Sequence, residues 1–394
     1  MDLTILVIAR RIERPKGVRF GPEVSREVIR SLYEGIASSH LAPFGRQMLL
    51  AMTCILISFS QSRAQDKYAG DFLQIPVGAR ALSMGGAFTA IADDESAFHW
   101  NAAGVSLVPD RQVGFMYSAE FGTPGNSLAD FYQLGFTYPL KDMTIAVNWV
   151  RLSVGDLMHT PDLTNISVAV ERAQMVEELY SGAPNYFSDN EDAFVLSLAR
   201  DNKFTVDWGW LYYKENIEVP IGVNFKIIHQ GIGNFGSASG IGVDAGAMLR
   251  FSLAEFLLQP ALGKISFGAS ASDLAGTRLA WSTQRTEIVP MHIDGGIAYT
   301  QPIPAIRTDA TFASDFLIGV RSLPQYGLEL TYAKDVSLRV GLDQGAFTTG
   351  AGFNWEKKVD VNYSLAINDA LGPEHRLSFS LDLDHLMQKD TTGE

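Results

Sequence analysis

The chain is 394 residues long and combines 46% hydrophobic residues with only 19% charged residues, whereas an ordinary soluble domain has roughly 25% charged residues. Its net charge of −13 argues against nucleic-acid binding, because that function needs basic patches that displace counterions from phosphates. No apolar run in the sequence reaches the ~18 residues of a transmembrane helix. Moderate hydrophobicity without such a run is typical of a transmembrane β-barrel, in which lipid-facing and lumen-facing residues alternate.

The longest apolar run of the sequence is Met48–Ser60. A basic residue precedes it and the small-x-small sequence of residues 62–64 follows it, an order typical of a secretory signal peptide. We therefore expect a signal peptide over residues 48–64, cleaved after Ala64, with a short buried helix as the alternative. The single cysteine, Cys54, lies in this run, so the mature chain would contain neither a disulfide nor a reactive thiol.

Residues 1–47 precede the predicted signal peptide, although a signal peptide normally begins at the N-terminus of its chain. We expect that translation starts near Met48 and that residues 1–47 are a start-site artefact. A cytosolic extension is the alternative.

Residues 65–110 are rich in glycine and other small residues and show no clear strand period. Asp93 and Asp94 lie at the predicted start of a short helix, where negative side chains meet the positive end of the helix dipole. Calcium binding by these carboxylates is the alternative, although the segment lacks the alternating ligand spacing of a calcium-binding loop.

Residues 111–384 alternate apolar and polar side chains in stretches of ~10 residues, the length of a transmembrane strand. Residues 359–368 are an example, with Val, Val, Tyr, Leu and Ile at alternate positions. The same alternation runs through residues 143–149, 219–227 and 377–383. Because successive side chains of a strand point to opposite faces, a period of two indicates β-structure. We predict an all-β fold, a single antiparallel transmembrane β-barrel of about 14 strands over residues 111–384.

A soluble antiparallel sandwich would show the same alternation, so two further features favour the barrel. The polar face carries small or charged residues that suit a wet lumen. They are Gly114, Gly135, Lys226, Asp244, Arg250 and Arg339. Aromatic residues gather near predicted strand ends, as in the girdles at membrane interfaces. They are Tyr138, Trp149, Trp208, Trp210, Tyr212, Tyr213, Tyr299, Tyr326 and Trp355.

The predicted connections are short on one side and long on the other. Residues 139–142 and 333–335 are predicted to be periplasmic turns, and residues 155–190 a long extracellular loop with a short helix over Glu171–Tyr180. Residues 231–236 match GxGxxG, but a strand pattern follows them, so they predict a hairpin loop rather than a dinucleotide site. We expect residues 385–394 to form a C-terminal tail.

Several short motifs resemble the PorV/PorQ group of FadL-like outer-membrane barrels. They are Val77–Ala81, Met84–Phe88, Ala92–Asp94, Trp100–Gly104, Leu371-Gly372 and His375–Ser378. Two features depart from that family, which usually has proline at the position of Ala102 and ends in a strand with a terminal aromatic residue. These departures put the shape of one turn and the recognition of the C-terminal end by the assembly machinery in doubt.

The resemblance implies that residues 65–110 fold into the barrel lumen as an N-terminal hatch or plug. Five residues of this segment are candidates for shaping or gating the lumen, and the alternative is that they only hold the plug in place. They are Arg80, Asp93, Asp94, Asn101 and Gly104.

The resemblance also implies location in the bacterial outer membrane and two possible functions. The first is a part in type IX protein secretion, with the barrel binding the signal domains of secreted cargo proteins or other secretion-system subunits. The alternative is a FadL-like channel that takes up small hydrophobic ligands. In both cases outer-membrane lipid surrounds the barrel.

Catalytic and metal-binding patterns are absent from the sequence. The histidines are scattered without HxxxH or HExxH spacing, and no GxSxG motif occurs. We therefore expect no enzyme activity, no cofactor and no metal site.

Overall fold

The computed structural model describes residues 69–120, 122, 127–159, 166–181, 186–207, 214–318, 324–368 and 372–387. The predicted signal peptide and residues 1–47 lie outside these ranges.

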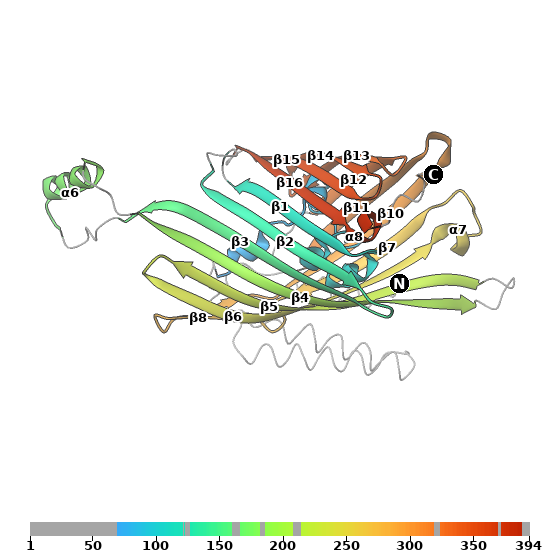
Figure 1. Ribbon diagram of the computed structural model, residues 1–394, viewed down its shortest axis with the longest axis horizontal. Helices are drawn as coiled ribbons and strands as arrows, with labels where there is room; N and C mark the ends of the chain where they lie inside the picture. Colours follow the sequence, from blue (N-terminus) through green and yellow to red (C-terminus); the bar gives the residue numbers. More distant parts are fainter. Residues whose placement is uncertain are drawn as a thin grey trace, which may run out of the picture. The chain divides into compact units, whose positions relative to one another are not determined.

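Fourteen strands of the described chain form a closed antiparallel ring (Figure 1). They are β1 (Gln112–Glu120), β2 (Ala129–Pro139), β3 (Thr144–Met158), β4 (Tyr186–Asp207), β5 (Lys214–Ile232), β6 (Gly236–Ser252), β7 (Lys264–Ser272), β10 (His292–Ile303), β11 (Thr308–Ile318), β12 (Gln325–Tyr332), β13 (Val336–Asp343), β14 (Ala346–Trp355), β15 (Val359–Asn368) and β16 (Gly372–Asp382). The last strand closes the ring on the first, with Gln112 opposite Asp382. This confirms the predicted fold, a single antiparallel barrel of 14 strands.

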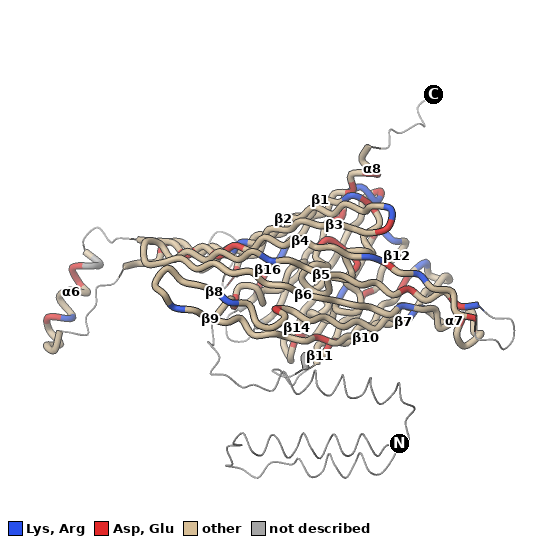
Figure 2. The backbone as a smooth tube through the Cα atoms, turned by 90° about the horizontal axis from the view of Figure 1, so that it is seen from below, with Lys and Arg blue, Asp and Glu red and all other residues tan. Residues whose placement is uncertain are grey.

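The alternation of side chains gives the barrel an apolar outer face. On β13, Leu338, Val340 and Leu342 point outward and are 61%, 43% and 44% exposed, while the intervening residues point inward. Tyr138, which lies next to the end of β2, and Trp355, at the end of β14, are exposed as well, as the sequence predicted. Water disfavours so much exposed apolar surface, whereas the hydrocarbon of a bilayer accepts it. Figure 2 shows that many of the charged residues lie near the turns and strand ends. Among the described helices, none is long and apolar enough to span a membrane.

Residues 69–110, here called the hatch segment, lie inside the ring. They form four short helices: η1 (Asp71–Gln74), α4 (Ala79–Ser83), α5 (Ala97–Trp100) and η2 (Ala102–Leu107). The small side chains of this segment are almost completely buried, with Ala79 and Ala92 both 0% exposed. This packing excludes water from much of the interior.

The expectation of a wet lumen is therefore wrong for the described part of the barrel. The inward side chains of Lys226 and Arg339 are only 6% and 5% exposed. Arg250 is less enclosed and its Nη1 lies 3.7 Å from Glu218 Oε2. Charged side chains in such a packed interior need partners, and the hatch and the neighbouring strands supply them.

Wall glycines make room for the hatch segment. A Cβ atom on Gly222 of β5 would lie 2.3 Å from the carbonyl oxygen of Ala102, and one on Gly246 of β6 would lie 2.0 Å from Asn101 Oδ1. Only glycine permits backbone to approach backbone so closely. The hatch therefore rests directly on these two strands.

The predicted connections agree with the structure except at one loop. Residues 139–142 and 333–335 form turns at the end of the barrel where α8 (Leu383–Met387) follows the last strand. Residues 231–236 form the β5–β6 hairpin, as predicted. The loop predicted over residues 155–190 is shorter, because β3 continues to Met158 and β4 begins at Tyr186. Its helix, α6 (Ala169–Ser181), contains the predicted helical residues.

One part of the wall departs from regular pairing. Two short strands, β8 (Thr277–Trp281) and β9 (Thr286–Val289), form a hairpin in which β8 pairs with β6 beyond the end of β7. Residues 273–276 separate β7 from β8, and residues 290–291 separate β9 from β10. The strand pairing of β7 ends before residues 273–276, and that of β8 begins after them, so these residues belong to no ladder. We call this place the strand break.

Candidate functional site

The predicted hatch residues Arg80, Asp93 and Asp94 lie together in the structure. Arg80 Nη1 lies 2.6 Å from Asp93 Oδ1 and 3.4 Å from Asp94 Oδ2. Its other nitrogens donate two hydrogen bonds of 2.9 Å to Glu329 of β12. Two parallel bonds to one carboxylate fix both distance and orientation, so this group ties helix α4 to the barrel wall.

Asp94 caps the turn that precedes α5. Its Oδ1 accepts hydrogen bonds from the backbone N–H of Ser96 at 2.9 Å and from the Ser96 hydroxyl at 2.6 Å. Burial raises the pKa of Asp94, while the Arg80 guanidinium opposes that shift. The neighbouring Glu95 has no such close cation, and burial together with the negative charge of Asp94 raises its pKa to about 8.

The other two predicted hatch residues, Asn101 and Gly104, lie together at helix η2. Asn101 Oδ1 accepts a hydrogen bond from Ala103 N–H at 3.1 Å, and Nδ2 donates to the carbonyl oxygen of Thr89 at 2.9 Å. A Cβ atom on Gly104 would lie 1.8 Å from the carbonyl oxygen of Ala92. These contacts hold the hatch segment in shape, so the five predicted residues form two groups rather than one site.

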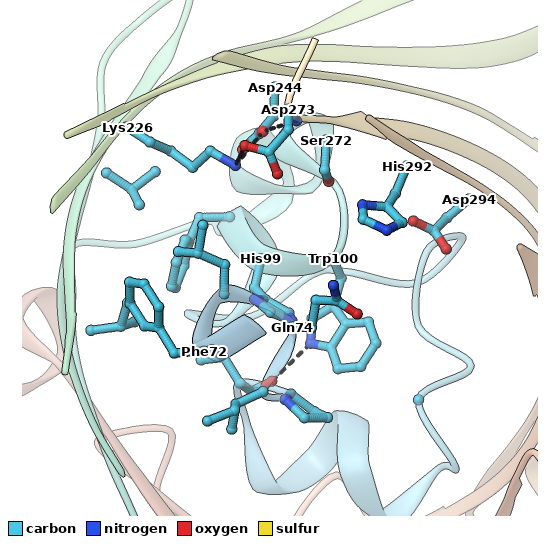
Figure 3. Close-up of a pocket in the computed structure, with 18 of the residues that line it drawn as sticks. Phe72, Gln74, His99, Trp100, Lys226, Asp244, Ser272, Asp273, His292 and Asp294 are labelled. Atoms are coloured by element: carbon cyan, nitrogen blue, oxygen red, sulfur yellow. Dashed lines mark hydrogen bonds and ion pairs between the residues drawn. The ribbon is translucent and has the colours of Figure 1, made fainter. Parts of the chain in front are cut away.

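A cavity of about 170 Å³ lies between the hatch segment and the wall. Figure 3 shows His99 and Trp100 of α5 between an apolar part and a charged part. The apolar lining includes Phe72, Ile75, Phe131, Val150, Val195 and Val289. The polar lining includes Gln74, Lys226, Asp244, Ser272, Asp273, His292, Asp294, Gln325 and Asp343.

A buried ion triad forms one end of the charged part. Lys226 Nζ lies 2.8 Å from Asp244 Oδ1 and 2.8 Å from Asp273 Oδ1 (Figure 3). Asn224 Nδ2 donates to Asp244 Oδ2 at 3.1 Å and to the carbonyl oxygen of Phe98 at 2.8 Å. The triad therefore connects β5 and β6 with the strand break, and it touches the hatch through α5.

His99 faces this triad in the neutral form. Burial, together with the positive charges of Lys226 and Arg376, lowers the pKa of His99 to about 4. The neighbouring Trp100 is held by a hydrogen bond of 2.8 Å from Nε1 to the carbonyl oxygen of Val77. The two rings are therefore fixed side chains that bring no charge to the cavity at neutral pH.

The strand break borders the cavity. Asp273 lies in the break and Ser272 and Val289 lie at its edges, and all three line the cavity. Asp273 and Ala275 have φ angles of 55° and 61°, a conformation that ends regular strand geometry. Two bonds of 2.8 Å hold the break to β6, from Leu274 N–H to the carbonyl oxygen of Val243 and from Asp273 N–H to Asp244 Oδ1.

The sequence patterns found only part of this cavity. Lys226 and Asp244 were assigned to the inner face of predicted strands, without a common site. Phe72, His99 and Asp294 were not singled out, because nothing in their local patterns shows that three distant segments meet. One signal was available in the sequence. Lys226 and Asp244 lie in the middle of two successive predicted strands, both on the inward face, which indicates that they could pair.

One group of possible metal ligands occurs among the described residues. Asp110, Asp382 and His385 offer ligand atoms that lie within 4.8 Å of one another. Asp382 Oδ1 already accepts hydrogen bonds of 2.9 Å from the backbone N–H groups of Asp384 and His385. His385 Nδ1 lies 2.9 Å from Asp382 Oδ2. These bonds explain the cluster as the cap of helix α8.

Comparisons with known proteins give limited information. A family model described as an uncharacterised protein family (UPF0164) matches residues 51–129. No curated protein matches the chain. Solved structures that resemble it include the toluene transporter TbuX of Ralstonia pickettii, with 10% identity and a TM-score of 0.44 over 78% of this chain and 98% of that one.

Two further solved structures are similar. A TodX monoaromatic hydrocarbon channel mutant has 13% identity and a TM-score of 0.40 over 78% of this chain and 99% of that one. A Pseudomonas aeruginosa FadL homologue has 10% identity and a TM-score of 0.36 over 76% and 96%. At such identities and TM-scores, the likeness assigns no activity to this chain.

Proposed function

We propose that the protein is an outer-membrane barrel that admits small, largely apolar molecules through the cavity between the hatch segment and the wall. The observation that carries this proposal is the contact between that cavity and the strand break. It supports the channel alternative over the secretion role that the sequence resemblance put first.

The outer face supports a location within a bilayer. Large apolar side chains are exposed on strands all around the ring, for example Phe136 at 39%, Phe225 at 46% and Phe312 at 51%. Because a closed ring leaves no free strand edge, it is one of two structures that can span hydrocarbon. The outer membrane is where bacterial barrels of this kind reside.

The anchors of the hatch segment favour passage around the hatch over its expulsion. Arg80 is bound to Glu329, and Arg376 of β16 donates to Glu120 at 3.0 Å and to the carbonyl oxygen of Pro76. The Arg376 side chain is only 1% exposed. Breaking one such buried pair costs ~3–5 kcal/mol. If the hatch stays in place, a molecule crosses the barrel with the least loss of stabilising contacts by way of the cavity and the adjoining strand break.

The strand break supports a path through or along the wall. Regular ladder bonds are missing around residues 273–276, so the hydrogen bonds of Asp273 and Leu274 and the ion pair with Lys226 hold this place instead. A molecule in the cavity touches Asp273 and Val289 directly. Local opening at the break would connect the cavity with the surroundings of the barrel.

The test compares two valine variants of the same strand. Val150 of β3 lines the cavity and is 4% exposed, whereas Val147 points outward and is 52% exposed. The full chain is produced in a Gram-negative host, and the initial uptake of a radiolabelled single-ring compound is measured. We expect faster uptake with the wild type and with Val147→Phe, and loss of that gain with Val150→Phe.

Uptake that is equal with and without the protein would contradict the channel proposal. Heat-dependent gel mobility checks that each variant forms a barrel. If Val150→Phe folds and keeps the full gain, the cavity is not the path.

A second candidate is the secretion role implied by the resemblance to the PorV/PorQ group. One observation favours it: α6, carried beyond the ends of β3 and β4, exposes Val170 at 65%, Met175 at 43% and Val176 at 39%. Exposed apolar residues on such an element suit a protein partner. Co-purification from the native host tests this role. Exported proteins that share a C-terminal domain, lost when the three residues become serine, would support it.

A further inference from the structure

We infer that the cavity selects uncharged single-ring molecules that carry a hydroxyl group, in preference to plain hydrocarbons and to charged compounds. This inference rests on the proposed function, because the same cavity is the path of the transported molecule. It adds the chemical class of that molecule. The residues that would recognise the hydroxyl group are His99 of α5 and Ser272 of β7.

The size and the apolar lining of the cavity suit one ring. Its volume is about 170 Å³, and an apolar cavity of ~150 Å³ in another protein holds one benzene molecule. Phe72 of the hatch, Phe131 of β2 and Val195 of β4 line it and are 2%, 1% and 4% exposed. These side chains offer a place for a ring but no hydrogen bond. A single ring with a short substituent therefore fills the space.

The charged side chains of the lining already have partners. In the ion triad, the lysine nitrogen lies 2.8 Å from both carboxylates. Gln325 Nε2 donates to Asp343 Oδ1 at 2.9 Å, and His292 and Asp294 have partners as well. A charged molecule would thus leave water without finding a free counter-charge. Burying an unpaired charge costs far more than burying a hydroxyl group, so charged compounds are disfavoured.

Two neutral polar side chains of the lining have no such partner. Neither the imidazole of His99 nor the hydroxyl group of Ser272 makes a hydrogen bond within the part of the chain that the structure describes. A neutral imidazole has one donor and one acceptor nitrogen, and a hydroxyl group can donate and accept. The amide of Gln74 lacks a bond among the described residues too, but this side chain is exposed to water. Recognition therefore falls to His99 and Ser272.

Neighbouring aromatic rings hold the imidazole of His99 in place. Its centroid lies 5.1 Å from that of Trp100 and 6.4 Å from that of Phe98, with the ring planes at 78° and 76°. The backbone N–H of His99 donates to the carbonyl oxygen of Ser96 at 3.0 Å. None of these contacts uses a hydrogen bond of the imidazole. A side chain that is fixed before binding loses little conformational freedom when it binds.

The arrangement of the residues matches a ring with one hydroxyl group. Figure 3 places His99 between Phe72 and Ser272. A ring against Phe72 would direct its hydroxyl group toward His99. A plain hydrocarbon in the same position would cover the imidazole and leave its polar atoms without a partner, which weakens binding.

The experiment compares four radiolabelled single-ring compounds, which are p-cresol, p-xylene, benzylamine and benzoate. The first two have nearly the same shape and differ in a hydroxyl group against a methyl group. Equilibrium dialysis against the purified full chain in detergent, at neutral pH, gives the dissociation constants after subtraction of uptake by detergent alone. We expect p-cresol to bind about tenfold more tightly than p-xylene, as one hydrogen bond predicts. Both charged compounds should bind more weakly than p-cresol.

Variants of the two recognising residues test the assignment. His99→Phe keeps an aromatic ring without nitrogens and should bind p-cresol and p-xylene about equally. His99→Gln keeps a donor and an acceptor and should retain a preference for p-cresol. Ser272→Ala should weaken the binding of p-cresol and leave that of p-xylene unchanged. Val150→Phe, which fills the cavity, should abolish the binding of both.

The matched control is a histidine outside the cavity. His159 is exposed and stacks on Phe235 with a centroid distance of 5.4 Å, and it does not belong to the cavity lining. His159→Phe should therefore bind all four compounds as the wild type does. Heat-dependent gel mobility checks that each variant forms a barrel. If His99→Phe does not, Ser272→Ala and the comparison of compounds on the wild type decide.

Three results would overturn the inference and leave the channel proposal intact. They are equal binding of p-cresol and p-xylene by the wild type, tighter binding of a charged compound than of p-cresol, and a full preference for p-cresol in both His99→Phe and Ser272→Ala. Absence of binding by all four compounds would also overturn it. The uptake assay described above then decides separately whether the channel proposal stands.

Discussion

Arg80 of the hatch segment and Glu329 of β12 are 249 positions apart in the chain and are joined by two hydrogen bonds of 2.9 Å. The same carboxylate accepts a hydrogen bond from Arg339 of β13. One acid thus holds two guanidinium groups, and the Glu329 side chain is only 6% exposed. The pairing fixes the hatch to the wall more firmly than the packing of small side chains would alone.

Replacing this acid should loosen the hatch. Glu329→Gln keeps the shape of the side chain but removes the negative charge that Arg80 and Arg339 share, and Arg80 then keeps only Asp93 and Asp94 of its own segment. Loss of one partner of a buried ion pair costs ~3–5 kcal/mol. We expect faster cleavage of the hatch by protease in the folded barrel and a lower thermal midpoint. Glu356→Gln removes an acid whose side chain is 62% exposed and serves as the control. Equal cleavage of both variants would show that Glu329 does not anchor the hatch.

Close packing between hatch and wall should make Gly222 intolerant of any side chain. Its Cβ would lie 2.3 Å from the carbonyl oxygen of Ala102, whereas nothing lies within 4 Å of a Cβ on Gly155. Overpacking costs ~1–3 kcal/mol, so Gly222→Ala should lower the thermal midpoint. Gly155→Ala should leave it unchanged. A stable Gly222→Ala barrel would mean that the hatch does not rest on β5.

Glu95 should make the hatch less stable as the pH rises from about 5 to 8. Burial and the charge of Asp94 raise its pKa from 4.5 to about 8, and Asp360 adds to this while Arg80 opposes it. A folded-state pKa above the unfolded value means that this stabilisation is complete below pH 4.5 and is lost as pH rises through about 8. The thermal midpoint of the wild type should therefore fall between about pH 5 and 8 relative to Glu95→Gln and change little above that range. Parallel profiles of the two proteins would contradict the assignment.

The ion triad at the strand break should control how easily the wall opens there. Lys226→Met leaves Asp244 and Asp273 facing each other without a cation, which costs ~3–5 kcal/mol in a buried place. We expect a lower thermal midpoint and, in the uptake assay, faster entry of apolar compounds. Lys226→Met combined with Asp273→Asn removes one of the two facing charges and should recover part of the stability. No change in either measurement would mean that the triad does not hold the break.

Local sequence patterns were sufficient for the strands of the barrel. The strand predicted over residues 359–368 has the bounds observed for β15, Val359–Asn368. A strand between lipid and a packed interior must alternate between residues that suit the lipid and residues that suit the interior. Because successive residues point to opposite faces, this alternation can be recognised from neighbouring residues of the sequence. For the same reason, the short turns and the β5–β6 hairpin were predicted correctly, because glycine and polar residues interrupt the alternation there.

The tertiary structure alone decided the cavity and the strand break. Phe72, Lys226 and Asp294 come from the hatch, β5 and β10, and only the closure of the ring brings them together. The sequence resemblance placed residues 65–110 in the lumen, but a segment without a strand period does not reveal which wall residues it covers. The break at Asp273 follows from the pairing of β6 with both β7 and β8. The sequence by itself therefore determined the alternation that makes a barrel, whereas contacts between distant segments determined what its interior can bind.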